Sequence, residues 1–441
     1  MRDLVFTSLF LVMLGMALRR AHLGLMLWAW SALFPPNDFL YGFARGLPFN
    51  KLSVACTLAA LLADRRRDVS LDPLMVLLLL FVAYVSLAFA ASEAPSGWGD
   101  DLYWRLVKVA IASLFIRFIA VDRLRLYSLI MAMGLAVGTG AVDEGLKFLV
   151  TAGGHHSKGP QSWGDENITA AIVLMVIPLL IYLRRYLALP LLRHTVLAVS
   201  VITVAAVIGT YSRGGFIGLL TLGGLGFITA RRKLLVLAVI AAGAVVLVEA
   251  APASWFQRIE STGHAEQDSS FMGRVIQWKI LTLMALDHPL LGGGILANTY
   301  PPVWQSYADR LGSELTFIPT PPPTKPYASH SIFFQVLGEN GFPGLALYLA
   351  VLWTAFRTTR RVQAKARLSP STLWAADLAA ALRVSLLLYC VTGAALPIPY
   401  LEFPYLLLGC VSALARIQAA ESRKAPRRSP LGPAPIPPTS I

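Results

Sequence analysis

The stretch VLAVSVITVAAVIGTYSRGGFIGLLTLGGLGFITA, residues 196–230, joins two long apolar runs through one short polar seam. Each run approaches the roughly 20 residues that a helix needs to cross the hydrocarbon of a bilayer. The seam, residues 211–215, carries an arginine and two glycines, and both residue types disfavour an apolar helix interior. The pattern therefore predicts two membrane helices that meet at a short turn.

The same pattern recurs along all 441 residues. The chain is 56% hydrophobic and only 14% charged, which leaves too little polar surface for a soluble protein of this length. The sequence predicts an all-α polytopic membrane protein with about 12–13 transmembrane helices. The expected spans are 4–18, 22–34, 50–63, 73–91, 104–120, 126–142, 167–183, 194–210, 215–230, 234–250, 330–356, 373–396 and 403–417.

The distribution of basic residues decides what the formal net charge of +14 means. Lysine and arginine cluster in short stretches between apolar runs, such as 65–67 and 231–233, which is the positive-inside pattern of cytoplasmic loops and argues against nucleic-acid binding. Placing these clusters inside puts the seam, the segment 143–166 and the long segment 251–329 on the outer side. A count of 13 spans places the N-terminus outside as well.

Four regions follow from this topology. They are N-terminal transmembrane helices at 1–250, a large periplasmic loop with helices at 251–329, C-terminal transmembrane helices at 330–418, and a disordered cytoplasmic tail at 419–441. In the loop, DSSFMGRVIQWKILTLMALDHP reads as a helix that Pro289 stops, followed by a turn with three glycines. The histidines lack metal-ligand spacing and the three cysteines lie in apolar segments, so no metal site or disulfide is expected.

Arg213 is the first candidate site residue. Gly214 and Gly215 follow it and open the next span, so their amides are expected to point out of a helix N-terminus, which favours an anion. Arg213 would add a forked, permanently charged donor for a phosphate or pyrophosphate. The alternative is an interfacial arginine whose side chain extends to lipid headgroups.

Arg274 lies on the expected loop helix, with Gln277 on the same face. It either binds at the outer face or is a solvated charge paired with Asp268 or Glu266. The expected loop helix therefore supplies a second candidate cation but leaves its role open.

His330 lies at the start of a span. A helix N-terminus disfavours the imidazolium form, so the pKa of His330 should be lowered, and a neutral imidazole can accept a proton from a sugar hydroxyl. The alternative is a histidine that merely caps its helix. Further along this span, Glu339 precedes a Gly-Phe-Pro-Gly kink and either polarises a network or packs against a polar neighbour.

Two segments, TYSRGGFIGLL at 210–220 and SHSIFFQVLGENGFPGLALYL at 329–349, resemble the signatures of the O-antigen ligase and polymerase superfamily. DSSFMGRVIQW at 268–278 and DHPLLGGGILANTY at 287–300 are similar to the loop helix and turn of that family. The N-terminal region and GPQSWGDENITAAIVL at 159–174 resemble the O-glycosylation ligases associated with exosortase A systems. Where the family has Asp-Asn-Asn, this chain reads Asp165-Glu166-Asn167.

The resemblance implies a glycosyltransferase of the GT-C type in the bacterial inner membrane, with its site facing the periplasm. It would move a glycan from undecaprenyl pyrophosphate, without metal or other cofactor. For the ligase branch the acceptor is a lipid A–core sugar hydroxyl. A protein Ser or Thr acceptor, repeat-unit polymerisation, and non-enzymatic transport of lipid-linked sugars are the alternatives.

The resemblance also implies roles for individual residues. Arg213, Arg274 and the amides of Gly214 and Gly215 would bind the pyrophosphate, and His330 would be the catalytic base of an inverting displacement. The residues expected to support them are Tyr211, Lys158, Asn167, Gln277 and Glu339.

Overall fold

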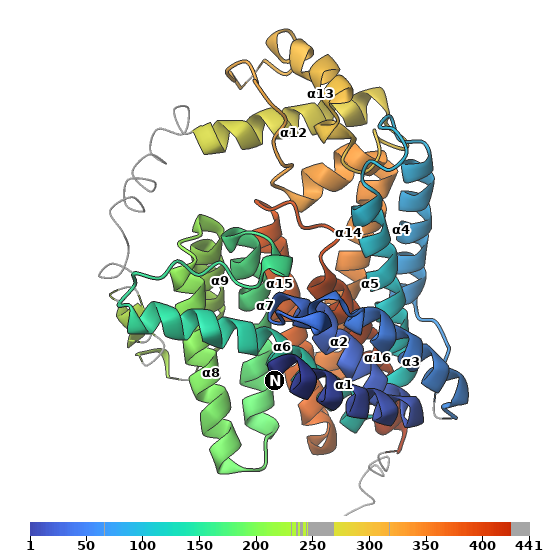
Figure 1. Ribbon diagram of the computed structural model, residues 1–441, viewed down its shortest axis with the longest axis vertical. Coiled ribbons are helices and arrows are strands. Elements are labelled where there is room, and N and C mark those ends of the chain that lie inside the picture. The colour runs from blue at the N-terminus through green and yellow to red at the C-terminus, as the bar shows by residue number, and fades with distance from the viewer. Residues whose placement is uncertain are drawn as a thin grey trace, which may run out of the picture.

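Helices make up every regular element in the described part of the computed structural model (Figure 1). That part comprises residues 1–65, 67–230, 269–316 and 318–424, with a few residues between 232 and 245. The predicted span 234–250 lies mostly outside it, and residues 251–268 and 425–441 lie outside it entirely. The α-helices are α1 (Arg2–Arg19), α2 (Ala21–Leu33), α3 (Phe49–Ala63), α4 (Pro73–Ala90), α5 (Asp100–Ile119), α6 (Arg123–Val150), α7 (Glu166–Tyr186), α8 (Pro190–Gly209), α9 (Arg213–Thr229), α12 (Ser269–Asp287), α13 (Pro301–Ala308), α14 (Ile332–Ala366), α15 (Leu373–Gly393) and α16 (Glu402–Lys424).

The predicted all-α class is confirmed, and each predicted span on fully described residues coincides with a helix. Seven described helices are long and apolar enough to cross a membrane, fewer than the 12–13 spans expected. They are α4, α6, α7, α8, α14, α16 and a 24-residue segment that ends with α15. The helices α2, α3 and α9 are apolar but shorter. Helix α2 ends at Leu33, just before Pro35 and Pro36, which disfavour its continuation.

One boundary of the predicted regions is wrong. Helix α16 continues to Lys424 instead of ending near residue 418. A hydrogen bond from Trp374 Nε1 to Glu421 Oε2 at 3.1 Å stabilises the added turn. Because Trp374 belongs to α15, the local sequence of α16 could not predict this contact. The remainder of the predicted tail, 425–441, lies outside the described residues.

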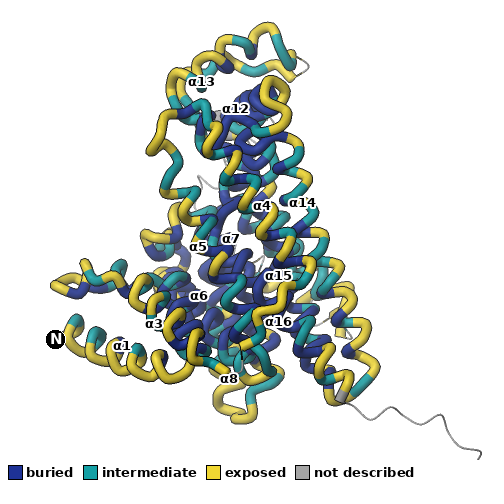
Figure 2. The backbone as a smooth tube through the Cα atoms, turned by 90° about the vertical axis from the view of Figure 1, so that its right-hand side faces the viewer, coloured by how far each residue is buried: buried dark blue, intermediate teal, exposed yellow. Residues whose placement is uncertain are grey.

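Helix α7 forms the centre of the bundle. Its residues from Thr169 to Leu180 are all buried, so no face of the helix is exposed to solvent or lipid over that length. It packs against α6, α8, α9 and α15, and Figure 2 shows it as a dark blue segment among more exposed helices. The beginning of α7 therefore leads directly into a helix segment that is packed on all sides.

Residues 269–316 form a compact unit that we call the loop cap. It contains α12, α13 and two short 3₁₀ turns, and its own small core includes Ile280, Met284, Trp304 and Tyr307. As predicted, α12 ends at Asp287, just before Pro289. In Figure 1 the loop cap lies above the bundle, with α12 crossing over the beginning of α14.

Helix α14 is broken at the predicted kink. Gly341 has φ 66° and ψ −174°, a conformation that suits glycine, and a Cβ there would collide with the carbonyl oxygens of Pro289 and Leu290. The glycine turn 290–294 that follows α12 therefore docks directly on the break. This contact fixes the loop cap to the membrane helix that begins just after His330.

Candidate active site

The beginning of α9 carries Arg213 as its first helical residue. Ser212 is the N-cap, and its Oγ accepts a hydrogen bond from the amide of Gly215 at 3.1 Å. The prediction that the Gly215 amide points outward to an anion is therefore wrong, because that donor is already used within the turn. Gly214 has no such bond, and a Cβ there would meet nothing closer than Ser212 Oγ at 3.7 Å.

Gly215 is needed for packing instead. A Cβ at this position would lie 3.0 Å from the Cβ of Ala170 on α7, closer than almost all real contacts. Glycine therefore allows α9 to approach α7 closely at this point. The two glycines of the seam have different structural roles, which the sequence alone did not distinguish.

Asn167 joins the beginnings of α7 and α9. Its Oδ1 accepts a hydrogen bond from Ser212 Oγ at 2.7 Å. Asp165 caps α7, because its Oδ1 accepts from the amides of Asn167 at 3.0 Å and Ile168 at 2.9 Å. Two helix N-termini, each with a partial positive charge, are thus held together beside Arg213.

His330 has an unusual backbone. Its φ is 45°, in the region that non-glycine residues rarely adopt. Its neighbour Ser329 is buried and doubly bound: the Ser329 carbonyl accepts from Trp278 Nε1 at 3.0 Å, and the Ser329 Oγ donates to Gln335 Oε1 at 2.6 Å. These bonds hold the backbone directly before His330 and thereby help to maintain its strained conformation.

The electrostatics of His330 fit a neutral imidazole. Burial and then the positive charge of Arg274 lower its pKa from the usual 6.5, while the carboxylate of Asp165 opposes the shift. The direction agrees with the sequence-based expectation. The causes differ, since burial and Arg274 dominate where the helix N-terminus was expected to act.

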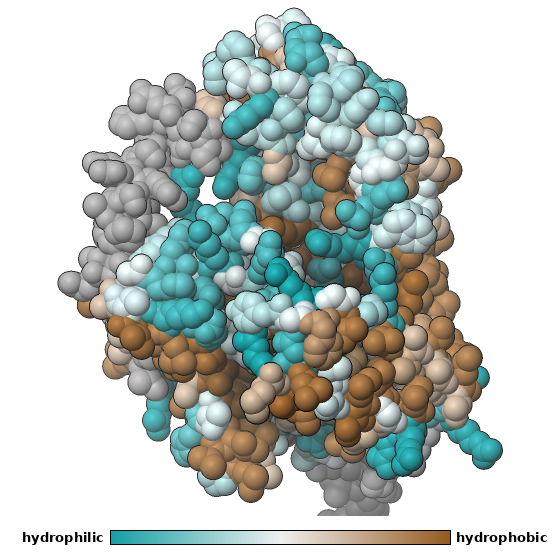
Figure 3. Space-filling model, viewed as in Figure 1, coloured by the Kyte–Doolittle hydropathy of each residue, from teal (hydrophilic) through white to brown (hydrophobic). Residues whose placement is uncertain are grey.

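Arg274 reaches this neighbourhood from α12. A Cβ at the preceding Gly273 would lie 3.2 Å from the ring of Tyr327, so α12 packs tightly against the chain just before His330. Asp268 and Glu266, the partners considered for Arg274, lie outside the described residues. The charges of Arg274 and Asp165 therefore both influence His330, and Asp165 is joined through Asn167 to Ser212, the residue before Arg213. Figure 3 shows the surface hollowed below the loop cap, with hydrophilic residues around the hollow.

Two of the expected supporting residues lie in the seam or in the segment before α7. Tyr211 has φ 50°, and its hydroxyl donates to the carbonyl of Gly153 at 2.6 Å, so it holds the segment before α7 against the turn. Lys158 is fixed by its backbone: its amide donates to Glu144 Oε2 at 2.9 Å and its carbonyl accepts from Thr169 Oγ1 at 2.6 Å. The side chain of Lys158 is exposed and forms no ion pair with a described residue.

Two further supporting residues, Gln277 and Glu339, are fully buried. Gln277 lies one turn after Arg274, and its amide group has no hydrogen-bond partner among the described residues. Glu339 accepts hydrogen bonds from Leu296, Gln335 and Tyr400. Sequence reasoning missed Gln335, although an amide four residues before a carboxylate in an apolar helix is a recognisable signal.

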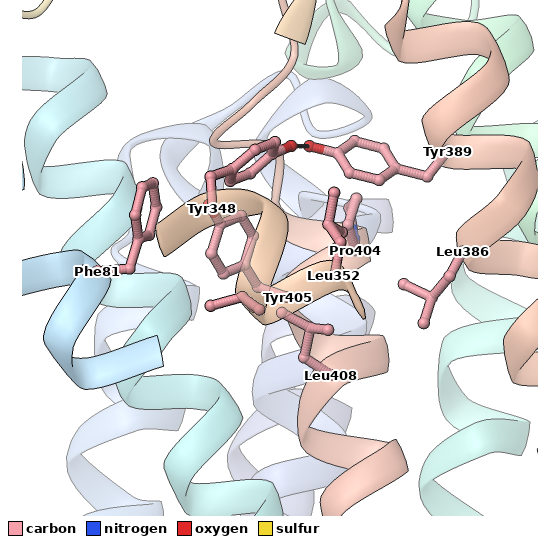
Figure 4. A pocket seen from close by; sticks show the side chains of 9 residues that line it. Phe81, Tyr348, Leu352, Leu386, Tyr389, Pro404, Tyr405 and Leu408 are labelled. Carbon is pink, nitrogen blue, oxygen red and sulfur yellow. Dashed lines mark hydrogen bonds between the residues drawn. The ribbon is translucent and has the colours of Figure 1, made fainter. Parts of the chain in front are cut away.

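An enclosed apolar cavity lies elsewhere, among α4, α14, α15 and α16 (Figure 4). Its volume of about 10 Å³ has room for one water at most. The hydroxyls of Tyr348 and Tyr389 meet at its edge, and none of its lining residues is a candidate site residue. The cavity is therefore a feature of helix packing and is separate from the hollow under the loop cap.

Comparison with known families gives two matches along the chain. Residues 198–349 match the family model described as O-antigen ligase, and this range contains Arg213, Arg274 and His330. Residues 1–188 match a family of unknown function, and no curated protein matches the chain. Neither match names the exosortase-associated subgroup, which stays a prediction. The match over residues 198–349 supports a relationship to the O-antigen ligase superfamily and a function of the ligase or polymerase type, in a chain whose described part is all-helical with seven helices long and apolar enough to cross a membrane.

Proposed function

We propose that the protein is an O-antigen ligase of the bacterial inner membrane. It transfers a glycan from undecaprenyl pyrophosphate to a sugar hydroxyl of lipid A–core on the periplasmic side. The observation that carries this proposal is the half-buried His330, on which the charges of Arg274 and of Asp165, at the capped beginning of α7, both act. A neutral imidazole beside a guanidinium suits a base that works next to a bound anion.

The donor pyrophosphate would be held by Arg213, Arg274 and the Gly214 amide. The joined beginnings of α7 and α9 add the partial positive charges of two helix N-termini, a recurrent way of binding phosphate. The exposed Lys158 is a further cation near the start of α7. The polyprenyl tail would lie against the apolar outer surface of the bundle.

In the reaction, the acceptor hydroxyl oxygen attacks the anomeric carbon of the donor sugar. The bond from that carbon to the pyrophosphate oxygen breaks, undecaprenyl pyrophosphate leaves, and the hydroxyl proton passes to His330. Negative charge grows on the pyrophosphate as the bond breaks, so fixed cations there stabilise the transition state more than the ground state. Attack from the opposite side inverts the anomeric configuration.

A protein Ser or Thr acceptor and repeat-unit polymerisation require the same donor chemistry. Mass spectrometry of the envelope from a deletion strain distinguishes them by asking whether lipid A–core, a protein or the glycan chain length changes. A transporter of lipid-linked sugars would place its ionisable residues along a path through the membrane. Arg213, Arg274 and His330 instead lie at helix beginnings and in the loop cap, which favours an enzyme.

The decisive experiment uses the purified full-length protein in lipid nanodiscs with undecaprenyl-pyrophosphate-linked glycan and lipid A–core. His330→Ala should lower transfer by a factor of at least about 100, the lower end of what general bases contribute. His194→Ala, an exposed histidine at the beginning of α8, is the matched control and should transfer normally. Near-normal transfer by His330→Ala would remove the base assignment, whereas no transfer by the wild-type protein would overturn the proposed function.

A further inference from the structure

Glu339 is a fully buried carboxylate within the membrane helix α14. A charged group in such a place is unfavourable unless strong hydrogen bonds compensate. Three donors do so: the amide of Leu296 at 3.0 Å, Gln335 Nε2 at 2.9 Å and the hydroxyl of Tyr400 at 2.9 Å. The three donors lie in the loop cap, in α14 and in the connection between α15 and α16, so Glu339 links these three parts of the protein.

The first contact leads to the loop cap. Leu296 follows the glycine turn, which also donates to α14 from Gly293 to the Gly338 carbonyl at 2.9 Å and from Gly294 to the Glu339 carbonyl at 3.0 Å. The turn is the direct continuation of α12, which carries Arg274. The Glu339 side chain therefore helps to set where α12 sits over α14.

The second contact leads to His330. Gln335 uses its Nε2 to donate to Glu339 and its Oε1 to accept from Ser329 Oγ at 2.6 Å. Ser329 precedes His330 and is buried, as is Gln335. This short chain of hydrogen bonds connects the carboxylate of Glu339 to the strained backbone at His330.

The third contact leads to the connection between α15 and α16. Tyr400 lies in this connection, and its hydroxyl also accepts from Asn340 Nδ2 at 2.9 Å. Nearby Tyr405 is equally buried, but its hydroxyl donates to the Pro399 carbonyl at 3.0 Å instead of to Glu339. The two tyrosines therefore form a matched pair, of which only one supports the carboxylate.

We propose that Glu339 is a positioning residue that sets the separation of Arg274 from His330. It does so by binding the turn after α12 and, through Gln335 and Ser329, the backbone beside the imidazole. The inference rests on the proposed function, in which Arg274 holds the leaving pyrophosphate and His330 accepts the proton. Glu339 itself touches neither substrate, since it is fully buried among its own donors.

Geometry, not charge, is what this role requires. Glu339→Gln keeps one oxygen that can accept from both Leu296 and Gln335, so it should retain transfer within a few-fold. Glu339→Ala leaves three buried donors without an acceptor and should lower kcat by about a hundredfold, the effect of a displacement near 1 Å. The turn has other anchors, since Glu93 donates from its amide to the Gly293 carbonyl at 3.0 Å, so we expect the variant to fold.

Gln335→Leu and Tyr400→Phe separate the contacts. Gln335→Leu breaks the connection to His330 while leaving the Leu296 contact, so kcat should fall and the affinity for undecaprenyl pyrophosphate should stay unchanged. Tyr400→Phe should lower kcat moderately, whereas Tyr405→Phe, the matched control, should leave it unchanged. Hydrogen exchange of the peptide covering 290–300 provides a readout independent of catalysis, and it should accelerate in Glu339→Ala but not in Glu339→Gln.

The outcomes distinguish the two levels of the inference. Normal kcat and unchanged hydrogen exchange in Glu339→Ala, with His330→Ala inactive, would overturn the positioning role alone. Glu339→Gln as inactive as Glu339→Ala would also overturn it, because the charge would then be essential. Absence of glycan transfer by the wild-type protein would instead overturn the proposed function, whatever Glu339→Ala does to the exchange rates.

Discussion

The hydroxyl of Ser212 donates to the side-chain oxygen of Asn167 at 2.7 Å and thereby joins the beginnings of α9 and α7. The same hydroxyl oxygen accepts the amide of Gly215, so Ser212 caps one helix while holding another. Because Asp165 caps α7 and influences the charge of His330, this contact relates Arg213 to the imidazole across two helices.

Substitution of Asn167 tests that relationship. Asn167→Ala removes the acceptor and should lower stability by about 1 kcal/mol, the usual value of one hydrogen bond. Asn167→Asp retains an acceptor for Ser212, so its thermal stability should exceed that of Asn167→Ala, but its negative charge should weaken binding of undecaprenyl pyrophosphate more. Thermal unfolding and a donor-binding assay measure the two effects, and equal donor affinities in both variants would contradict the assignment of an anion to this place.

The two glycines of the seam should behave differently. Gly215→Ala forces a Cβ against Ala170 and should destabilise the protein by about 1–3 kcal/mol. Gly214→Ala meets no such contact, so it should unfold like the wild type yet raise the KM for the donor, because its Cβ obstructs approach to the helix N-terminus. Thermal unfolding and donor kinetics separate the two, and an unchanged KM in Gly214→Ala would exclude pyrophosphate contact with that amide.

Arg213 should depend on the shape of its side chain as well as on its charge. Arg213→Lys keeps the charge and loses the two-pronged donor, so transfer should fall moderately, and Arg213→Ala should reduce it further. Arg193, an exposed arginine at the beginning of α8, is the control, and its replacement by alanine should be neutral. Mild and equal losses in both Arg213 variants would return the residue to headgroup anchoring.

The pH dependence of kcat/KM should follow the charges around His330. A base acts in its neutral form, and the pKa of His330 is lowered below 6.5, so activity should persist below pH 6.5 and fall on further acidification. Arg274→Gln removes a charge that lowers the pKa and should move the acid limb to higher pH. Asp165→Asn retains an N-cap residue, removes the opposing charge and should move the limb to lower pH. Shifts in the same direction would show that another group titrates.

Local sequence information was sufficient for the helices and their interruptions. The break at Gly341 and the stop before Pro289 follow from residues whose backbone limits act wherever they occur. Ser212 lies within the seam, and the preference of serine for the N-cap position could have been recognised from the sequence. The expected count of 12–13 spans stays a prediction, since seven of the described helices reach spanning length and three further apolar helices are shorter.

The sequence by itself determined a helical membrane protein, the seam with Arg213, and the candidacy of Arg274 and His330, because hydropathy, helix punctuation and motif residues are local properties. The tertiary structure alone decided which donor of the seam is used, what lowers the pKa of His330, and what Glu339 binds. Those facts depend on α7, the loop cap and the α15–α16 connection meeting α14. Contacts between residues far apart in the sequence produce no local or periodic sequence pattern, so they cannot be predicted from the sequence in this way.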